Sequence, residues 1–327
     1  MLMSLFNRIF GNPDQPEQRP DETSDPERKF QILKDDGVRA RNMKEIPFAI
    51  QCFKEALKIK DDTETLSYLA EAYLLAGQTE AALPCLEKLT TAEPDNLRLL
   101  LTATHAALQC KQYDKAQIWL DQASHTAPDE PHVLYMEAQL LHEHHNDIMA
   151  VAKVTQALLY DEKLLMAYEL RAKILLGMGQ PAEAVKDTTR LVAEAPDQED
   201  YQLLHGKALS AAQQPEAAEA AFQAALEANP FSLEAPLHLA RLYSSTHRLD
   251  KALQTCNNLI EAHPDSAEAY KMRGAVKMAL HNEAGAADDL KKSLTLKPQQ
   301  VEEMTGEFTN VENKMNERYR NLNPYGF

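Results

Sequence analysis

The chain is poor in glycine, in aromatic residues and in positive charge. Of its 327 residues only 10 are glycine and only 6% are aromatic, while 34 Lys and Arg stand against 50 Asp and Glu, for a formal net charge of −16. Because binding to phosphates needs a positive field, this balance argues against a nucleic-acid partner, including RNA bound by a helical-repeat protein.

Cysteine and long apolar runs are also scarce. No apolar run approaches the roughly 18 residues of a membrane span. The first eleven residues, MLMSLFNRIFG, lack the apolar core and cleavage site of a secretory signal. Four cysteines occur, none in a CxxC pair or with the spacing of metal ligands: Cys52, Cys85, Cys110 and Cys256. We interpret them as reduced thiols of a cytoplasmic protein.

Motifs of catalytic and nucleotide-binding sites are absent. The sequence contains no GxGxxG, GxxxxGK[ST], HExxH or GxSxG. Its densest group of metal-ligand residue types is LHEHHND at 141–147, with His142, His144 and His145. Adjacent histidines point in different directions on a helix, and no Cys or Asp pair completes a coordination shell. We therefore interpret them as surface histidines and predict no enzyme activity, no cofactor and no metal site.

What the sequence does have is a period of 34 residues. Proline stands at six of seven positions with this spacing, and Glu162 takes the seventh: Pro94, Pro128, Pro196, Pro230, Pro264 and Pro298. Alanine recurs with the same period at Ala82, Ala116, Ala150, Ala184, Ala218, Ala252 and Ala286. Ala49 precedes this series by 33 residues, so one residue is missing, which we place near Asp61 and Asp62.

A second small residue lies twelve positions before each of these alanines. The set is Gly37, Ala70, Thr104, Ala138, Ala172, Gly206, Ala240 and Gly274. Apolar residues three and four apart surround both positions, which is the spacing of one helix face. Two helices pack closely only where the side chains at their crossing are small. The period therefore predicts a pair of packed helices in each unit, with a proline ending the second helix.

One unit, LSYLAEAYLLAGQTEAALPCLEKLTTAEP at 66–94, resembles a tetratricopeptide repeat. The family's packing positions are occupied here by Leu66, Leu69, Ala70, Tyr73, Ala82, Leu86 and Pro94. The resemblance covers about 30–298. It implies an all-α fold, a right-handed α-solenoid of about eight helix-turn-helix repeats, in which stacked neighbours bury a continuous core that one hairpin could not bury alone.

The two ends of the chain differ from the repeats. Residues 11–28 are rich in Pro, Asp, Glu and Gln, so we expect a disordered leader over 1–29. Within it, residues 1–10 carry an amphipathic set formed by Leu2, Leu5, Phe6, Ile9 and Phe10. Residues 299–320 are predicted to form a capping helix, and 321–327 a tail. The apolar stripe of that helix is Val301, Met304, Phe308, Val311, Met315 and Tyr319.

The resemblance also implies that the first helix of each unit lines a concave groove. One position after each small residue, the chain reads Val38, Glu71, His105, Gln139, Lys173, Lys207, Arg241 and Ala275. Three successive units thus place a cation at one register. We predict that Lys173, Lys207 and Arg241, with Gln139 and His105 beside them, bind an acidic peptide or a terminal carboxylate. The alternative is a solvated face with unrelated charges.

These features predict a non-catalytic interaction scaffold in the cytoplasm that holds a partner's peptide or helix in its groove. The alternative is a membrane-associated assembly or tethering factor anchored by residues 1–10. Against membrane contact stands the single cation of that segment, Arg8, because surface-bound helices usually carry more positive charge. A further alternative is that residues 1–10 dock into the protein's own groove.

Overall fold

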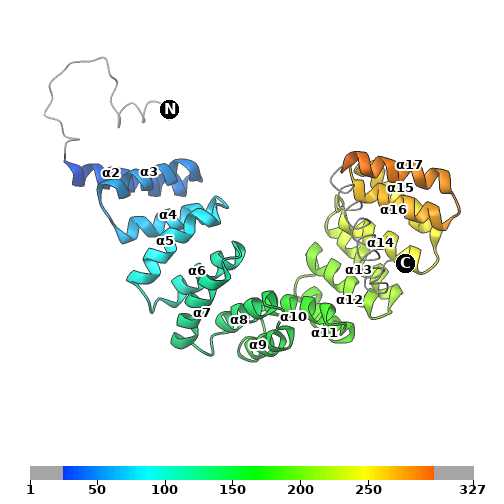
Figure 1. The fold of residues 1–327 in the computed structure, drawn as a ribbon, viewed down its shortest axis with the longest axis horizontal. Helices are drawn as coiled ribbons and strands as arrows, with labels where there is room; N and C mark the ends of the chain where they lie inside the picture. Colours follow the sequence, from blue (N-terminus) through cyan, green and yellow to red (C-terminus); the bar gives the residue numbers. More distant parts are fainter. Residues whose placement is uncertain (1–24, 298–327) are drawn as a thin grey trace, which may run out of the picture. The chain divides into compact units, whose positions relative to one another are not determined.

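Residues 25–297 are described by a computed structural model, and all of their regular structure is helical. They form sixteen α-helices, and this part of the chain contains no strand (Figure 1). The all-α helical-repeat solenoid predicted from the period is therefore confirmed. The predicted boundary at residue 30 falls inside the first helix, which begins at Pro26. The amphipathic segment 1–10, the capping helix 299–320 and the tail 321–327 lie outside the described residues.

The described helices belong to two compact units, and the chain passes from one to the other between His144 and His145. The N-terminal unit contains α2 (Pro26–Asn42), α3 (Ile46–Ile59), α4 (Thr63–Leu75), α5 (Thr79–Ala92), α6 (Leu97–Gln109), α7 (Tyr113–Thr126) and α8 (Pro131–Glu143). Within this unit every helix packs against the next one along the chain.

The C-terminal unit follows the same plan. It contains α9 (Asp147–Tyr160), α10 (Leu165–Gly177), α11 (Pro181–Glu194), α12 (Glu199–Ala211), α13 (Pro215–Ala228), α14 (Glu234–Ser245), α15 (Leu249–Ala262), α16 (Ala267–Ala279) and α17 (Glu283–Leu296). Successive helices again pack against each other, and first helices such as α12 and α14 also contact the first helix of the next repeat. Contacts are thus local in sequence, as expected of a repeat array.

The periodic alanines lie where the helices cross. All eight are fully buried, with 0% exposure: Ala49, Ala82, Ala116, Ala150, Ala184, Ala218, Ala252 and Ala286. The small residues twelve positions earlier are buried as well. The prolines also act as predicted, since Pro94, for example, directly follows Glu93, the C-cap residue of α5. The missing residue is in the turn after α3, where three residues separate Ile59 from Thr63 and four separate Ala92 from Leu97.

Glycine at the small position makes room for an aromatic ring sixteen residues later. A Cβ atom on Gly206 would lie 2.4 Å from the ring of Phe222, and one on Gly37 would lie 2.5 Å from Phe53. At Gly274 the nearest atoms are instead a backbone oxygen and a leucine carbon, each at 3.3 Å. We expected small residues to let backbones touch. In the two glycine–phenylalanine units the space is filled by a ring.

The turn inside each hairpin has one recurring backbone conformation. Between residues 25 and 297, eight residues adopt positive φ, between 55° and 70°, and they follow the repeat period: Lys44, Gly77, Lys111, His145, Gly179, Gln213, His247 and His281. In the second repeat, for example, the N–H of Gln78 donates to the carbonyl of Tyr73, and the N–H of Gly77 donates to the carbonyl of Leu74. This pattern satisfies the last carbonyls of the first helix. Only two of the eight residues are glycine, so the turn conformation could not be predicted from glycine positions in the sequence.

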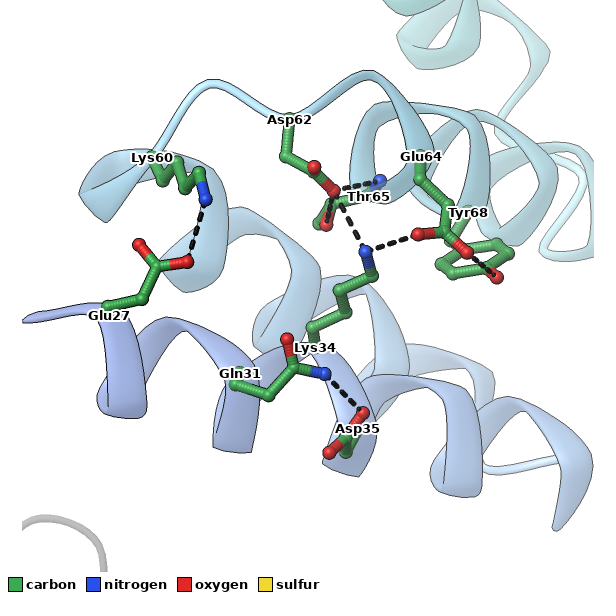
Figure 2. A network of polar contacts seen from close by, with 9 residues as sticks. All are labelled: Glu27, Gln31, Lys34, Asp35, Lys60, Asp62, Glu64, Thr65 and Tyr68. Atoms are coloured by element: carbon green, nitrogen blue, oxygen red, sulfur yellow. Dashed lines mark hydrogen bonds and ion pairs between the residues drawn. The ribbon is translucent and has the colours of Figure 1, made fainter.

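A polar network joins α2 to the start of α4 (Figure 2). The Lys34 ammonium donates to Asp62 at 3.1 Å and to Glu64 at 2.5 Å, and its side chain is only 13% exposed. Asp62 also caps α4 by accepting from the backbone N–H and the hydroxyl of Thr65. Those hydrogen bonds from Thr65 lower the pKa of Asp62. The network ties the first hairpin to the second through charges as well as apolar packing.

The cysteines are free thiols in the described structure, and three of the four are buried. Burial raises the pKa of Cys52 and of Cys256 to about 11. These two thiols are therefore protonated and poorly nucleophilic at neutral pH. Over residues 25–297, no helix combines the length and the apolar character that crossing a membrane requires.

We expect Gly206→Ala to destabilise the protein by about 1–3 kcal/mol, because the added methyl group meets the buried ring of Phe222. Combining it with Phe222→Leu should recover much of that loss, since the second repeat already has alanine and leucine at the equivalent positions, Ala70 and Leu86. Urea unfolding followed by circular dichroism measures both. The matched control is Gly177→Ala, where a Cβ meets nothing within 4 Å. If both glycine changes behave alike, the packing argument is wrong.

Gln213→Gly should stabilise the protein by about 0.5–1 kcal/mol. Gln213 has a φ of 59°, and this left-handed conformation costs a residue with a Cβ about 1–2 kcal/mol. Glycine avoids that strain, but it loses more conformational entropy on folding, which offsets part of the gain. The reverse change at the equivalent position, Gly179→Gln, should destabilise by a similar amount. Thermal unfolding of the three proteins compares them directly, and a lower melting temperature for Gln213→Gly would contradict the prediction.

Candidate functional site

Two of the three predicted cations line one cavity in the C-terminal unit. Lys207 lies on α12 and Arg241 on α14, the first helices of adjacent repeats. The cavity has a volume of about 380 Å³. Its walls are Lys207, Ser210, Ala211, Phe222, His238, Arg241, Leu242 and Ser245. It therefore combines two cations and two hydroxyls with an apolar and aromatic wall.

The aromatic wall follows from the helix crossing in this repeat. Because residue 206 is glycine, the ring of Phe222 from α13 fits against α12. His238, from α14, stacks on that ring with 5.2 Å between the ring centroids and 10° between the planes. The packing of three helices thus holds an imidazole beside the two cations.

His238 is neutral at physiological pH. Burial lowers its pKa to about 4, and the charges of Lys207 and Arg241 add to this effect. The carboxylate of Glu234 acts in the opposite direction, but its oxygen lies 3.9 Å from Nε2 of His238. The imidazole can therefore donate or accept a hydrogen bond without adding charge.

The two cations differ in how they are compensated. Nζ of Lys207 lies 3.1 Å from a carboxylate oxygen of Glu234, and this hydrogen bond lowers the pKa of Glu234. Arg241 is exposed and makes no hydrogen bond or ion pair with any residue from 25 to 297. Its planar guanidinium presents donors that suit a carboxylate or a phosphate.

Lys173 does not line this cavity. It lies one repeat earlier on α10, where its ammonium pairs with Glu169 one turn away at 2.5 Å. Pairs of this kind on an exposed helix face are weak, so Lys173 can exchange Glu169 for another anion. The structure therefore brings together Lys207 and Arg241, and it leaves Lys173 as a neighbour on the preceding first helix of the same unit.

The other two predicted groove residues lie in the N-terminal unit. His105 is exposed on α6. Gln139, on α8, donates a hydrogen bond from Nε2 to the hydroxyl of Tyr135 at 3.0 Å. Its amide oxygen is buried without a hydrogen-bond partner among the described atoms. Gln139 is thus held by its own helix.

The N-terminal unit has a larger cavity, of about 660 Å³, formed by α4, α5 and α6. Its apolar wall includes Leu74, Leu86 and Leu99, and acidic side chains such as Glu71 and Glu93 also line it. Arg98 is the charged residue of opposite sign in the lining. This cavity is more acidic than the one around Arg241, whose lining contains no Asp or Glu.

The histidine cluster has a structural setting. His145 occupies the positive-φ position of its turn. The ring of His144 meets Tyr113 edge-on, with centroids 5.8 Å apart. Within the described residues no group of three His, Cys, Asp or Glu side chains is arranged to hold a metal ion.

Sequence reasoning missed part of the cavity. Neither Phe222 nor His238 is among the residues that the sequence predicts for the groove. Their stacking depends on Gly206, which is one of three glycines at the small position. A signal was present: His238 precedes Arg241 by three residues, a spacing that puts both on one helix face.

Comparisons with known proteins agree with the repeat geometry. Family profiles described as tetratricopeptide repeat match residues 73–140 and 209–276, and a second such profile matches 169–232, which together make up more than half of the chain. A comparison with curated proteins gives no match.

Solved structures with a similar fold come from several sources. A tetratricopeptide repeat protein from Parabacteroides merdae matches with a TM-score of 0.59 and 13% identity, over 81% of this chain and 98% of that one. The C-terminal part of a repeat protein from Cytophaga hutchinsonii gives 0.57 and 16%, over 72% and 96%. A chain of the APC/C hetero-tetramer Cut9–Hcn1 gives 0.54 and 15%, over 83% and 53%. At these identities the likeness concerns the fold.

We expect acid to destabilise the protein through His238. Its folded-state pKa of about 4 lies below the ordinary value of about 6.5, so between these pH values the unfolded chain binds a proton that the folded chain does not. The stability present above pH 6.5 is therefore lost as the pH falls to 4, by on the order of 3 kcal/mol. Urea unfolding at several pH values measures this, and His238→Gln should flatten the dependence. An NMR titration of His238 with a midpoint near 6.5 would contradict it.

Proposed function

Because the chain belongs to the tetratricopeptide repeat family, whose members generally serve as non-enzymatic interaction modules, we propose that it is a non-catalytic scaffold that binds a segment of a partner protein. The binding surface we propose is formed by the first helices of the C-terminal unit. Lys207 and Arg241 bind a carboxylate of the partner there, and Lys173 contacts the same segment one repeat earlier.

The observation that carries this proposal is the state of Arg241. A guanidinium that has no hydrogen bond or ion pair with the described residues, and that lines a cavity, retains all its donors for a ligand. Arg98, at the N-terminal cavity, is in the same state. The other seven arginines of the described chain each have a partner.

The cavity also suits the rest of a carboxylate-bearing residue. The hydroxyl of Ser210 supplies a further donor, whereas that of Ser245 donates to the carbonyl of Leu242. The neutral His238 stacked on Phe222 supplies an aromatic surface for the attached carbon chain. A ligand carboxylate would compete with Glu234 for Lys207, so we expect moderate affinity and a strong dependence on salt.

The proposal places the protein in the cytoplasm. Its thiols are free, and three are buried, which suits a reducing compartment. A partner in the same compartment can be captured from native cells by crosslinking and identified by mass spectrometry. That partner then supplies the peptide for quantitative binding.

The test is the double variant Lys207→Ala/Arg241→Ala, assayed by fluorescence anisotropy with the captured partner's acidic segment. We expect binding to weaken by at least about tenfold and to lose most of its salt dependence, because two charge-assisted hydrogen bonds disappear. Adding Lys173→Ala should weaken it less than the first two changes. Helicity should be unchanged, since Arg241 is exposed and Lys207 is partly exposed.

The matched control removes two cations from a second helix of the same unit. Lys186 and Arg190 lie on α11, paired with Glu183 and Glu194. Lys186→Ala/Arg190→Ala changes the net charge equally and should leave binding within about twofold. If both double variants bind alike, the cations around the cavity act only through net charge and the proposal is wrong.

A further inference from the structure

The outward face of α9 is apolar, and the one charged residue near it, Lys153, lies at its edge. It exposes Ile148 at 74%, Met149 at 47%, Leu159 at 82% and Tyr160 at 53%. Ala152 and Gln156 lie between these two pairs on the same face. The buried residues of α9, among them Ala150, Val154 and Ala157, occupy the opposite side. The packing of the repeat therefore does not explain the apolar face.

The other repeats act as internal controls for this face. The six positions of this face are 148, 149, 152, 156, 159 and 160, and each has an equivalent in the other repeats. Each of the other seven second helices, α3, α5, α7, α11, α13, α15 and α17, carries at least two Asp, Glu, Lys or Arg at these positions. On α11, for example, they include Glu183, Lys186 and Arg190. Second helices ordinarily present charge to water. Alone among the eight described second helices, α9 presents large apolar side chains and no charge there.

The order of residues along the face is symmetric. Ile148 and Tyr160 are equally far from residue 154, as are Met149 and Leu159, and Ala152 and Gln156. In an antiparallel helix pair around a two-fold axis, each large residue at one end therefore meets a large residue at the other. The small Ala152 and the amide of Gln156 lie near the axis, where helices approach most closely. An isologous contact requires this kind of self-complementarity.

We propose that α9 is a dimerisation surface and that its occupant is α9 of a second copy of this chain, packed antiparallel. Four large side chains per copy, at roughly 100–150 Å² each, amount to about 1,000 Å² over both copies, at the low end of specific interfaces. The dimer should therefore dissociate on dilution. Asp147 and Asp161 lie at the two ends of α9, so the antiparallel pair brings Asp147 of one copy near Asp161 of the other. Added salt screens the repulsion between these carboxylates, and it should therefore not weaken the dimer.

The dimer would leave the cavity around Arg241 open, because Lys207 and Arg241 lie on first helices and α9 is a second helix of the same unit. Two copies then present two carboxylate-binding sites in one particle. A partner with two acidic segments, or a partner that is itself a dimer, would gain affinity through effective concentration. The dimer itself does not depend on the proposed function.

Sedimentation equilibrium of the full chain over about 1–100 µM tests the proposal. We expect a reversible shift from the monomer mass of 36.7 kDa toward twice that value. Ile148→Glu/Leu159→Glu should weaken the dimer by at least about a hundredfold, because each copy then places two carboxylates in the contact. Both positions are exposed, so circular dichroism and urea unfolding should match the unaltered chain.

The matched control is Ile118→Glu, which places the same charge at an exposed isoleucine of another second helix, α7, at 57% exposure. It should leave the dimer unchanged. Cysteine pairing tests the orientation: Met149→Cys and Leu159→Cys should form a disulfide across copies in a mixture, and neither should do so alone. A monomer over the whole range, a dimer that the double variant does not weaken, or pairing of Met149→Cys with itself would each overturn the proposal.

Discussion

The crossing of two helices within each hairpin is the constraint on which the rest of the structure depends. In the hairpins that lie within one compact unit, a fully buried alanine on the second helix lets it approach a small residue on the first. The residue four positions after that alanine varies between repeats. It is phenylalanine in the repeats of Gly37 and Gly206, whose rings take the space of the missing side chain. It is leucine, valine, threonine or cysteine in the other repeats. In the two glycine–phenylalanine repeats, volume lost on the first helix is thus regained on the second.

The same constraint positions the candidate site. A phenylalanine at residue 222 is tolerated only because residue 206 has no side chain, and its ring then forms the wall on which His238 stacks. Lys207 follows Gly206 directly, so it must emerge beside that wall. The cavity is therefore a by-product of a packing solution used in this repeat, with the cations of two first helices placed around it by the repeat period.

The features that recur in every repeat could be predicted from the sequence. Periodic alanines and prolines located the helices, and a register counted from the small residues brought Lys207 and Arg241 to adjacent first helices. It could not show that Lys173 pairs with Glu169 on its own helix, because a long flexible side chain chooses between a local and a distant anion by small energy differences. It also missed the positive-φ turns, because lysine, glutamine and histidine hold most of them in place of glycine. In those turns the hydrogen bonds of the helix end outweigh the local strain.

In an array of similar units, function must lie in residues that depart from the pattern, but departure alone is not sufficient. Arg171 and Arg273 are also irregular within the repeat, yet each makes two hydrogen bonds to an aspartate sixteen residues later, at 2.6 and 2.8 Å, across its own crossing. Those aspartates, Asp187 and Asp289, are buried, so the pairs hold the hairpins together. Arg241 differs because no described residue satisfies its donors. The helix α9 differs because large apolar side chains such as Ile148 and Leu159 stay exposed on its outward face. A hydrogen-bond donor without a protein partner and an exposed apolar surface can each contribute favourable free energy when another molecule binds.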